Sequence, residues 1–427
     1  MSVFSELQWR GLVHTASEGV EEHLAASDRA FYIGFDPTAS SLHVGSLLQI
    51  LNMARMQRFG HHPIALAGGG TGLIGDPSGK SQERQLLTKE KVQENLVGIK
   101  EQLSRILDFD TKTNPARLVD NGDWLNTIHL VDFMRDIGKH FTVNYMLAKE
   151  GVQRRLEGED GISYTEFTYL LLQSYDFLVL FDRHGCTTQM GGSDQWGNIT
   201  AGAELIRRLR QKKAYALVAP LVMTASGVKF GKTEEGAVWL DPELTSPYRF
   251  YQYWLGTNDL DVVKYLKYFT WLDESEIAEL EAMHEKAPHE RQAHRRLAAE
   301  VTRIVHGPTA VERAELSSKV LFGAEITDLG TKDILEIFGD VPSTQLSPAA
   351  LDGGGIALTE LMVTSGLSAS KGAAKRLIRD GGVYLNNRRI GDERLAVARD
   401  HFLDGSVLVL RKGQKHYHLV NLEGESS

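Results

Sequence analysis

Cysteine is almost absent from this chain of 427 residues, in which Cys186 is the only one. A single cysteine excludes an internal disulfide and a metal site built from several thiolates. No apolar run approaches the roughly 20 residues that span a membrane. Residues 1–11 lack the charged, apolar and small-residue order of a signal peptide. These absences lead us to expect a cytoplasmic protein without a membrane partner.

A surplus of positive charge is also lacking, since the formal net charge is -9, and this argues against a general nucleic-acid coat. The charge is nevertheless uneven. Between Lys371 and Lys415 there are 11 Lys and Arg against 5 Asp and Glu, so this stretch carries +6 and the remainder -15. Such a confined basic module is either a solvated charged surface or a surface that follows a phosphate backbone. The candidate contacts are Lys371, Lys375, Arg376, Arg379, Arg388, Arg389, Arg411 and Lys412.

The first half of the chain alternates apolar runs with helical patterns. Residues 30–35 read as a strand, 47–59 as a helix and 62–67 as a second strand, followed by a glycine-rich turn at 68–75. This order predicts an open, mostly parallel α/β sheet. The same reasoning predicts a helix over 83–107 and strands at 177–181 and 214–222.

The second half has a different character. Residues 246–322 are poor in glycine and periodic, which predicts several helices. Pro342, Pro348 and the three glycines at 353–355 suggest a linker, and 356–420 a small unit of two helices and short strands. A chain of this length favours two or three domains. We expect boundaries at 1–245, 246–325, 326–355 (linker) and 356–427.

The stretch from Gly70 to Gly75 matches the dinucleotide fingerprint G-x-G-x-x-G. A nicotinamide-dependent oxidoreductase would also need a second strand that ends in an acidic residue about 20 positions later. The chain instead enters a polar helical stretch, so we interpret the match as a coincidence of a glycine-rich turn. The neighbouring Gly75–Ser81 resembles a P-loop but has three residues rather than four between its glycines.

Two distant segments suggest a triphosphate site. His43 follows the first strand at the start of a helix, where backbone N–H groups and the imidazole can converge on anionic oxygens, and Thr38 adds a hydroxyl. Lys229 and Lys232 lie in a glycine-containing loop that would ordinarily be a solvated turn. Paired with His43, these lysines are point charges able to stabilise a departing pyrophosphate. The pair predicts activation of a substrate by ATP.

Two further groups of polar residues have both an ordinary and a functional interpretation. Asp194 lies in a Ser-, Asp- and Asn-rich turn and either caps a helix or accepts from ribose hydroxyls. Tyr169, Gln173 and Asp176 are spaced i, i+4 and i+7, which places them on one face of a helix. That face is either half-buried or lines a polar ligand pocket.

Together these segments resemble the bacterial type of tyrosyl-tRNA synthetase, a family of class I aminoacyl-tRNA synthetases. The likeness covers nearly the whole chain and is carried by Gly34-Phe-Asp-Pro-Thr38, Thr71-Gly-Leu-Ile-Gly-Asp-Pro-Ser78, Gly191-Gly-Ser-Asp-Gln-Trp-Gly-Asn198 and Lys229-Phe-Gly-Lys-Thr233. It implies a Rossmann-like parallel-sheet catalytic domain, a helical anticodon-side domain and a small S4-like α+β RNA-binding domain.

The resemblance also implies the reaction and its participants. L-Tyrosine would be activated by ATP, which carries Mg²⁺, and transferred to tRNA(Tyr) by a homodimer without a tightly bound cofactor or metal. Two alternatives remain at this stage. One is the oxidoreductase built on Gly70–Gly75, and the other is a homologue that binds RNA without catalysis.

Implied roles fall on residues of this sequence that match the family motifs. The residues that hold phosphates and stabilise the transition state would be Thr38, His43, Lys80, Arg84, Lys229, Lys232 and Thr233. The ATP site would further include Gly34, Asp36, Gly45, Ser46, Gly192 and Asp194. Tyr32 and Asp176 would bind the substrate phenol, Asp76, Tyr169 and Gln173 its ammonium, and Gln195 its carboxylate.

Two residues depart from the family pattern. Ser46 stands where the signature usually has its second histidine, and Ile33 where the family often has cysteine near the ribose. Serine keeps a hydroxyl donor but has less reach, and isoleucine has no donor. We therefore expect weaker contacts to ATP rather than loss of activity.

Overall fold

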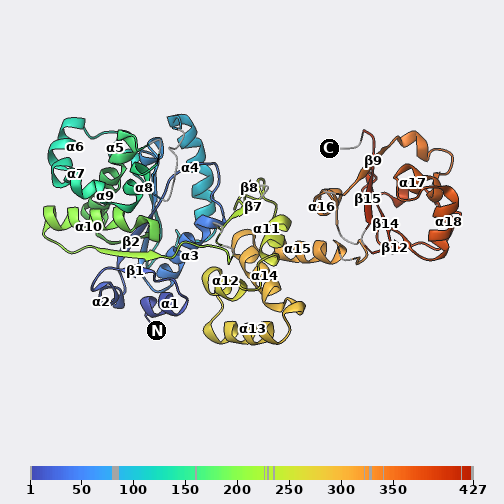
Figure 1. The fold of residues 1–427 in the computed structure, drawn as a ribbon, viewed down its shortest axis with the longest axis horizontal. Helices are drawn as coiled ribbons and strands as arrows, with labels where there is room; N and C mark the ends of the chain where they lie inside the picture. Colours follow the sequence, from blue (N-terminus) through green and yellow to red (C-terminus); the bar gives the residue numbers. More distant parts are fainter. Residues whose placement is uncertain are drawn as a thin grey trace. The chain divides into compact units, whose positions relative to one another are not determined.

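The computed structural model describes residues 2–78, 86–158, 161–225, 227, 230–233, 236–321, 323–326, 329–339, 341–414 and 416–424. It contains two compact units, residues 1–305 and 306–427 (Figure 1). No helix among these residues has the length and apolar character of a membrane span.

The first unit is built on a six-stranded sheet with the strand order β1-β6-β5-β2-β3-β4. Strands β2 to β6 are parallel and β1 is antiparallel to β6, which confirms the expected mostly parallel α/β sheet. The strands are β1 (Thr15–Ala16), β2 (Ala30–Phe35), β3 (His62–Ala67), β4 (Arg117–Asp120), β5 (Cys186–Gly192) and β6 (Tyr215–Ala219).

Helices cover both faces of this sheet. From β2 the chain crosses through α3 (Val44–Arg58) to β3, and from β5 through α10 (Trp196–Arg210) to β6, on the other side of β2. Right-handed crossovers in opposite directions place their helices on opposite faces (Figure 1). The remaining helices up to α8 are α1 (Val3–Trp9), α2 (Val20–Ala25), α4 (Lys89–Ser104), α5 (Gly122–Leu125), α6 (Leu130–Asp136), α7 (Val143–Leu147) and α8 (Glu150–Leu156).

The strand predicted at 177–181 is wrong, because these residues lie in the 21-residue helix α9 (Tyr164–His184). The Ser163 hydroxyl caps its first turn, and Gly185 ends it with φ +63°, in the left-handed region that favours glycine. Because α9 packs against α10 and β5, its inward face is apolar over several turns. A short apolar run does not distinguish such a helix from a buried strand.

The helices predicted over 246–322 are present, but they are divided between the two units, since α15 (Pro308–Leu321) belongs to the second. Helix α11 begins with Ser246 as its cap and proline in its first turn, and α13 has the reciprocal capping box of Asp273 and Glu276. The helices are α11 (Pro247–Leu255), α12 (Val262–Phe269), α13 (Glu274–Lys286) and α14 (Gln292–His306). A hairpin of β7 (Lys232–Thr233) and β8 (Gly236–Ala237) precedes them.

The second unit has its own core around a five-stranded sheet of order β12-β11-β14-β15-β9. Strand β9 lies within the predicted linker 326–355 and pairs in parallel with β15, so much of this segment is part of the unit. The elements are α15 (Pro308–Leu321), α16 (Thr331–Ile337), β9 (Ser343–Leu346), β10 (Ile356–Ala357), α17 (Leu358–Thr364), α18 (Lys371–Arg379), β11 (Val383–Leu385), β12 (Arg388–Arg389), β13 (Ala396–Val397), β14 (Val407–Lys412) and β15 (His416–Leu422).

Helix α18 presents half of the candidate RNA contacts to solvent, namely Lys371, Lys375, Arg376 and Arg379. Ala374 and Ile378 are buried, whereas Lys375 and Arg376 are exposed. Arg411 is the exception to the predicted basic surface, because it is 7% exposed and its guanidinium stacks 3.8 Å above the Tyr384 ring. It stabilises the core of this unit and is excluded from the candidate RNA contacts.

Candidate active site

The candidate site is a cavity of about 320 Å³ at the carboxyl ends of β2 and β5. The strand order reverses between these two strands, and ligands of open α/β sheets bind at such switch points. The predicted residues that line the cavity are Tyr32, Gly34, Asp36, Thr38, His43, Gly45, Ser46, Asp76, Tyr169, Gln173, Asp176, Gly192, Asp194 and Gln195. Residues far apart in the sequence therefore meet at one place.

Asp176 is the centre of a buried hydrogen-bond network in this cavity. It projects from α9 and is 2% exposed. One carboxylate oxygen accepts from the Trp124 indole N–H at 2.7 Å and the other from the Asn121 amide at 2.9 Å. Burial raises the pKa of Asp176 to about 7, although these two hydrogen bonds act in the opposite direction. The network fixes the orientation of the carboxylate and leaves it further acceptor capacity.

Two buried polar atoms on the paired strands β2 and β5, in residues that line the cavity, lack hydrogen-bond partners among the residues that the structure describes. They are the Tyr32 hydroxyl and the side-chain oxygen of Gln189. The two residues pair in register on β2 and β5 and both line the cavity. Burial, followed by the charge of Asp176, raises the pKa of Tyr32 well above its ordinary value, so this hydroxyl keeps its proton. An unpaired buried donor is costly, and a ligand in the cavity would satisfy it.

Asp36 links helix α9 to the glycine-rich turn at 68–75. Its carboxylate accepts from the Tyr169 hydroxyl at 2.8 Å and from the Thr71 hydroxyl at 2.7 Å. Thr71 in turn accepts from Asn121, which also donates to Asp176. Burial and the nearby carboxylates raise the pKa of Tyr169 well above 10, so Tyr169 remains a donor to Asp36.

A second network joins the remaining polar residues. Gln195 donates to Asp76 at 2.6 Å and accepts from Gln173 at 3.1 Å. Asn198 on α10 donates to Gln173 on α9 at 2.8 Å. These bonds fix α9, α10 and the segment of Asp76 relative to one another. The carboxylates of Asp36, Asp76, Asp176 and Asp194 all line the cavity, and this concentration of negative charge suits a cationic group.

His43 is the N-cap of α3, and its position corrects one expectation. The N–H groups of Val44, Gly45 and Ser46 are already bonded, to the Val238 carbonyl, the His43 ring Nδ1 and the His43 carbonyl, respectively. They are therefore not open to anionic oxygens, contrary to our prediction for this helix start. Because Nδ1 accepts from Gly45, a neutral His43 carries its proton on Nε2.

The two signature segments meet at this helix start. Phe230 is buried and its ring stacks on Phe269 at 5.3 Å, within an aromatic cluster of the helical segment. The next residue, Gly231, has φ +86°, and a Cβ there would lie 2.9 Å from Val44 and 3.2 Å from the Gly45 nitrogen. Glycine thus permits the loop to approach α3, and the aromatic anchor holds it there.

Several predicted residues lie outside what the structure describes. These are Lys80, Arg84 and Lys229, together with the side chains of Lys232 and Thr233, whose backbone forms β7. Their assigned roles stay predictions.

Sequence reasoning missed Asn121, Trp124, Thr71 and Gln189. Asn121 directly follows the carboxyl end of β4, and polar residues at such strand ends are a usable signal. Thr71 belongs to the glycine-rich stretch that we dismissed as a coincidence. That dismissal remains correct for a dinucleotide site, but the turn contributes to the network of the cavity.

If Asp176 binds the substrate phenol, as the family resemblance implies, its raised pKa predicts that this binding depends on pH. If the carboxylate form accepts a hydrogen bond from the ligand, binding strengthens as pH rises through about 7 and weakens below it. We expect kcat/KM for tyrosine in ATP–pyrophosphate exchange to rise between about pH 6 and pH 8 and then level off. The Asp176→Asn variant should lose this rise. A profile that is flat, or identical in the variant, would contradict the assignment.

Ser46 lines the cavity as expected, so its substitution can be tested. Ser46→His should lower KM for ATP about two- to tenfold, because one added hydrogen bond contributes about 0.5–1.5 kcal/mol. Ser46→Ala is the control, since it removes the hydroxyl without adding reach. Steady-state exchange kinetics with varied ATP give both constants. Unchanged KM and kcat in Ser46→His would refute the expected weakness of this contact.

Comparisons with known proteins agree with this geometry. Residues 25–323 match the tRNA synthetases class I (W and Y), and residues 333–420 match the Tyrosine--tRNA ligase SYY-like C-terminal domain. The chain is 54% identical to the Tyrosine--tRNA ligase of Roseiflexus castenholzii, covering 99% of both chains. It is 50% identical to that of Geobacillus stearothermophilus, covering 98% of this chain and 99% of the relative.

Solved structures show the same fold for the first part of the chain. A C-terminally truncated mitochondrial tyrosyl-tRNA synthetase of Aspergillus nidulans superposes with a TM-score of 0.68 and 29% identity, over 75% of this chain and 94% of that one. The corresponding Coccidioides posadasii structure gives 0.64 and 32%, over 74% and 91%. These matches show that the chain belongs to the tyrosyl-tRNA synthetases, a class I aminoacyl-tRNA synthetase family.

Proposed function

We propose that this chain activates L-tyrosine with ATP and transfers the tyrosyl group to tRNA(Tyr), with the residue roles given below. Family membership gives the overall reaction, aminoacylation of tRNA with tyrosine. The observation that carries the residue assignment is the pairing of an oriented, buried carboxylate with an unpartnered buried hydroxyl, at Asp176 and Tyr32.

This pair is complementary to a phenol. The substrate hydroxyl would donate to Asp176 and accept from Tyr32, satisfying the one polar group of Tyr32 that lacks a partner in the described structure. Phenylalanine would fill the same space but leave the Tyr32 hydroxyl without a partner and Asp176 with its bonds from Asn121 and Trp124 alone. A buried group left without its partner costs about 1–3 kcal/mol. Discrimination between the two amino acids follows from hydrogen bonding, not from size.

The rest of the amino acid would meet the second network. Asp76, Tyr169 and Gln173 would hold the ammonium, in the part of the cavity that is rich in carboxylates. Gln195 lies between Gln173 and Asp76 and would approach the substrate carboxylate with its amide. The reacting oxygen would thereby be directed toward the α-phosphate of ATP.

Activation needs charge stabilisation rather than a covalent enzyme intermediate. A tyrosine carboxylate oxygen attacks the α-phosphorus of ATP, the bond to the bridging oxygen breaks, and pyrophosphate leaves. Thr38 and His43, on the cavity wall near the start of α3, would donate to the phosphates. Asp36, Gly192 and Asp194 would face the nucleoside. Mg²⁺ would arrive bound to ATP as part of the substrate.

The lysine-containing segment would complete the phosphate site. Phe230 and Gly231 hold this segment against Val44 and Gly45, which supports a role for the neighbouring Lys229, Lys232 and Thr233 at the pyrophosphate. Lys80 and Arg84 are assigned to the same phosphates on the family motif alone.

The second unit would bind tRNA. Exposed Lys371, Lys375, Arg376 and Arg379 lie along one helix, α18, and could follow a phosphate backbone. Together with the helical segment, this unit would place the 3'-terminal adenosine at the activated tyrosine.

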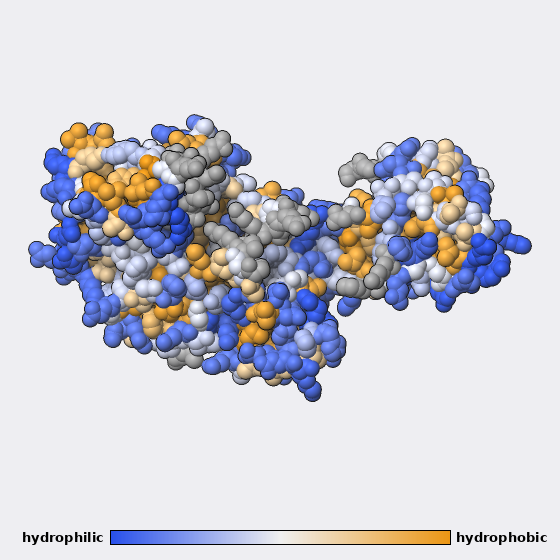
Figure 2. All heavy atoms as spheres, in the orientation of Figure 1, coloured by the Kyte–Doolittle hydropathy of each residue, from blue (hydrophilic) through white to orange (hydrophobic). Residues whose placement is uncertain are grey.

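A homodimer is part of the proposal. Leu130, Val131 and Val143 are 70%, 74% and 60% exposed on α6 and α7, where Figure 2 shows an apolar patch. Exposed apolar surface of this kind marks interfaces. Sedimentation equilibrium of the chain tests this directly, and a monomer at all concentrations would contradict it.

The activity is tested by tyrosine-dependent ATP–pyrophosphate exchange followed by charging of tRNA(Tyr). We expect both reactions from one purified chain. Exchange without charging would limit the proposal to amino-acid activation, and the absence of exchange would overturn it.

A further inference from the structure

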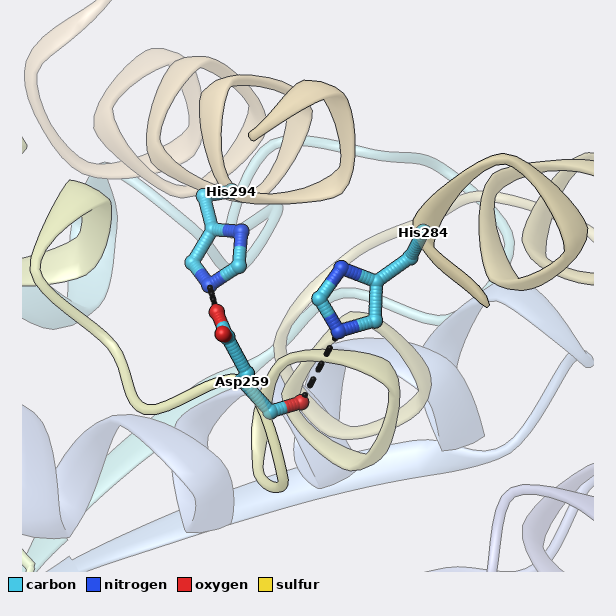
Figure 3. Close-up of side chains that lie close together, drawn as sticks. All are labelled: Asp259, His284 and His294. Atoms are coloured by element: carbon cyan, nitrogen blue, oxygen red, sulfur yellow. Dashed lines mark hydrogen bonds and ion pairs between the residues drawn. The ribbon is translucent and has the colours of Figure 1, made fainter. Parts of the chain in front are cut away.

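A group of three potential metal ligands lies outside the active site, in the helical segment of the first unit. Asp259 comes from the connection between α11 and α12, His284 from α13 and His294 from α14 (Figure 3). One potential ligand atom from each residue lies within 4.8 Å of the other two. Figure 3 shows both imidazoles directed toward Asp259.

The environment of these side chains leaves their nitrogen atoms poorly satisfied. The His294 side chain is fully buried, and its Nε2 lies 3.1 Å from a carboxylate oxygen of Asp259. His284 donates from Nε2 to the Asp259 backbone carbonyl at 3.1 Å. Since a carbonyl only accepts, this Nε2 is the protonated nitrogen, and the buried Nδ1 is left with a lone pair and no partner in the described structure.

A hydrogen-bonded His–Asp pair is the simplest alternative explanation of the contact between His294 and Asp259. Arg291 supports it, because its guanidinium lies 3.9 Å from the same carboxylate and partly balances the charge. This alternative does not account for His284, whose ring faces the His294 ring at 5.4 Å between centroids and has an unpaired nitrogen. Two imidazoles and a carboxylate that converge are a donor set for a divalent metal.

We propose that Asp259, His284 and His294 form a binding site for a divalent transition metal, and Zn²⁺ fits the donors best. Zinc takes two imidazole nitrogens and a carboxylate oxygen at about 2.0–2.2 Å, with water as a common fourth ligand. Tetrahedral bonds of this length place ligand atoms about 3.4 Å apart. A modest closing of the group therefore suffices. Asp259 is exposed, which gives the ion a path from solvent.

The metal would stabilise the helical segment and, through it, the residues that precede Phe230. It would join the α11–α12 connection to α13 and α14. Two residues after Asp259, the Asp261 carboxylate accepts from the Ala225 N–H at 2.7 Å, and Lys264 donates to the Met223 carbonyl at 3.1 Å. These bonds hold the base of the segment that continues to Phe230. The proposed metal site thus lies outside the cavity of the candidate active site, and it supports the segment that leads to Phe230.

The test is a metal titration of the full chain after treatment with a chelator. We expect one Zn²⁺ per chain, intense visible ligand-field absorption with Co²⁺, and a higher Tm on loading, because a ligand that binds only the folded state stabilises it. His284→Gln and Asp259→Asn should each weaken binding by about 100-fold or more, since even changes around the ligands cost 10–100-fold.

His289→Gln is the matched control, because His289 is exposed in the same α13–α14 connection and lies outside the group. It should bind Zn²⁺ like the unaltered chain. Absence of stoichiometric binding would overturn the proposal, as would equal binding by His284→Gln, Asp259→Asn and the control. Near-ultraviolet circular dichroism verifies that each variant is folded. None of these readouts depends on the aminoacylation reaction.

Discussion

Replacing Asp176 by asparagine should lower kcat/KM for tyrosine in ATP–pyrophosphate exchange by about 10- to 150-fold or more. Hydrogen bonds to a charged partner contribute about 1.5–3 kcal/mol, and each 1.36 kcal/mol is a factor of ten in rate. The substitution also turns one oxygen into a donor. Because Asn121 and Trp124 both donate to this side chain, one of them would then face an NH₂ group across 3 Å or less. The variant therefore loses the substrate contact and disturbs the group that orients it.

The same helix provides a matched control. Asp182 lies on α9 about two turns later, is 35% exposed and pairs with Arg210 at the surface. Asp182→Asn should leave kcat/KM for tyrosine within about twofold, because exposed ion pairs contribute about 0–1 kcal/mol. Both variants need the circular dichroism spectrum of the unaltered chain. Equal losses in the two variants, or full activity in Asp176→Asn, would contradict the assignment of the phenol to Asp176.

Removing residues 331–427 should abolish most tRNA charging while leaving amino-acid activation nearly intact. We expect kcat/KM for tRNA(Tyr) to fall by about 100-fold or more, because several phosphate contacts together contribute orders of magnitude in affinity. Tyrosine-dependent exchange should stay within about twofold, because the residues that line the cavity belong to the other unit. The cavity lies entirely in the first unit, between Tyr32 and Leu221 in sequence.

The structure determines where this cut must fall. A truncation at residue 353, within the linker expected at 326–355, would remove β15 and leave its partner β9 behind as an unpaired edge strand. A cut before α16 removes the sheet as a whole. The double variant Lys375→Gln and Arg376→Gln is the milder companion, since both side chains are exposed on α18. Equal loss of exchange and charging in the truncated chain would count against an RNA-binding role.

The strands of the catalytic fold were predictable where the local pattern and the tertiary environment agree. Residues 30–35 and 62–67 are short, apolar and bounded by turn residues, and they form β2 and β3 with those limits. The run 177–181 has the same appearance but belongs to α9, because helix α9 is buried over several turns and reads as continuously apolar. In the expected linker the sequence hides a strand instead. Two prolines and three glycines near β9 suggested irregular structure, but β9 pairs with β15, about 75 residues later in the chain.

The site was predictable mainly through motifs. Spacing correctly placed Tyr169, Gln173 and Asp176 on one helix, and the cavity brings them to Tyr32. The residues that orient Asp176 were missed, because Asn121 and Trp124 meet it only after β4 is placed at the sheet edge. The hydrogen bond of the Val44 N–H at the start of α3 could also not be predicted from the sequence, because its acceptor is the carbonyl of Val238 in a distant segment. Contacts between segments that are far apart in the sequence could not be predicted from local sequence patterns.

The central claim is that the cavity selects tyrosine by its phenol, and ATP–pyrophosphate exchange with a panel of amino acids tests it most directly. The panel includes tyrosine, phenylalanine and tryptophan, each varied at saturating ATP. We predict efficient exchange with tyrosine alone, and loss of the preference over phenylalanine when Tyr32→Phe and Asp176→Asn are combined. Exchange that is faster with tryptophan, equal with phenylalanine, or absent with every amino acid would contradict the account.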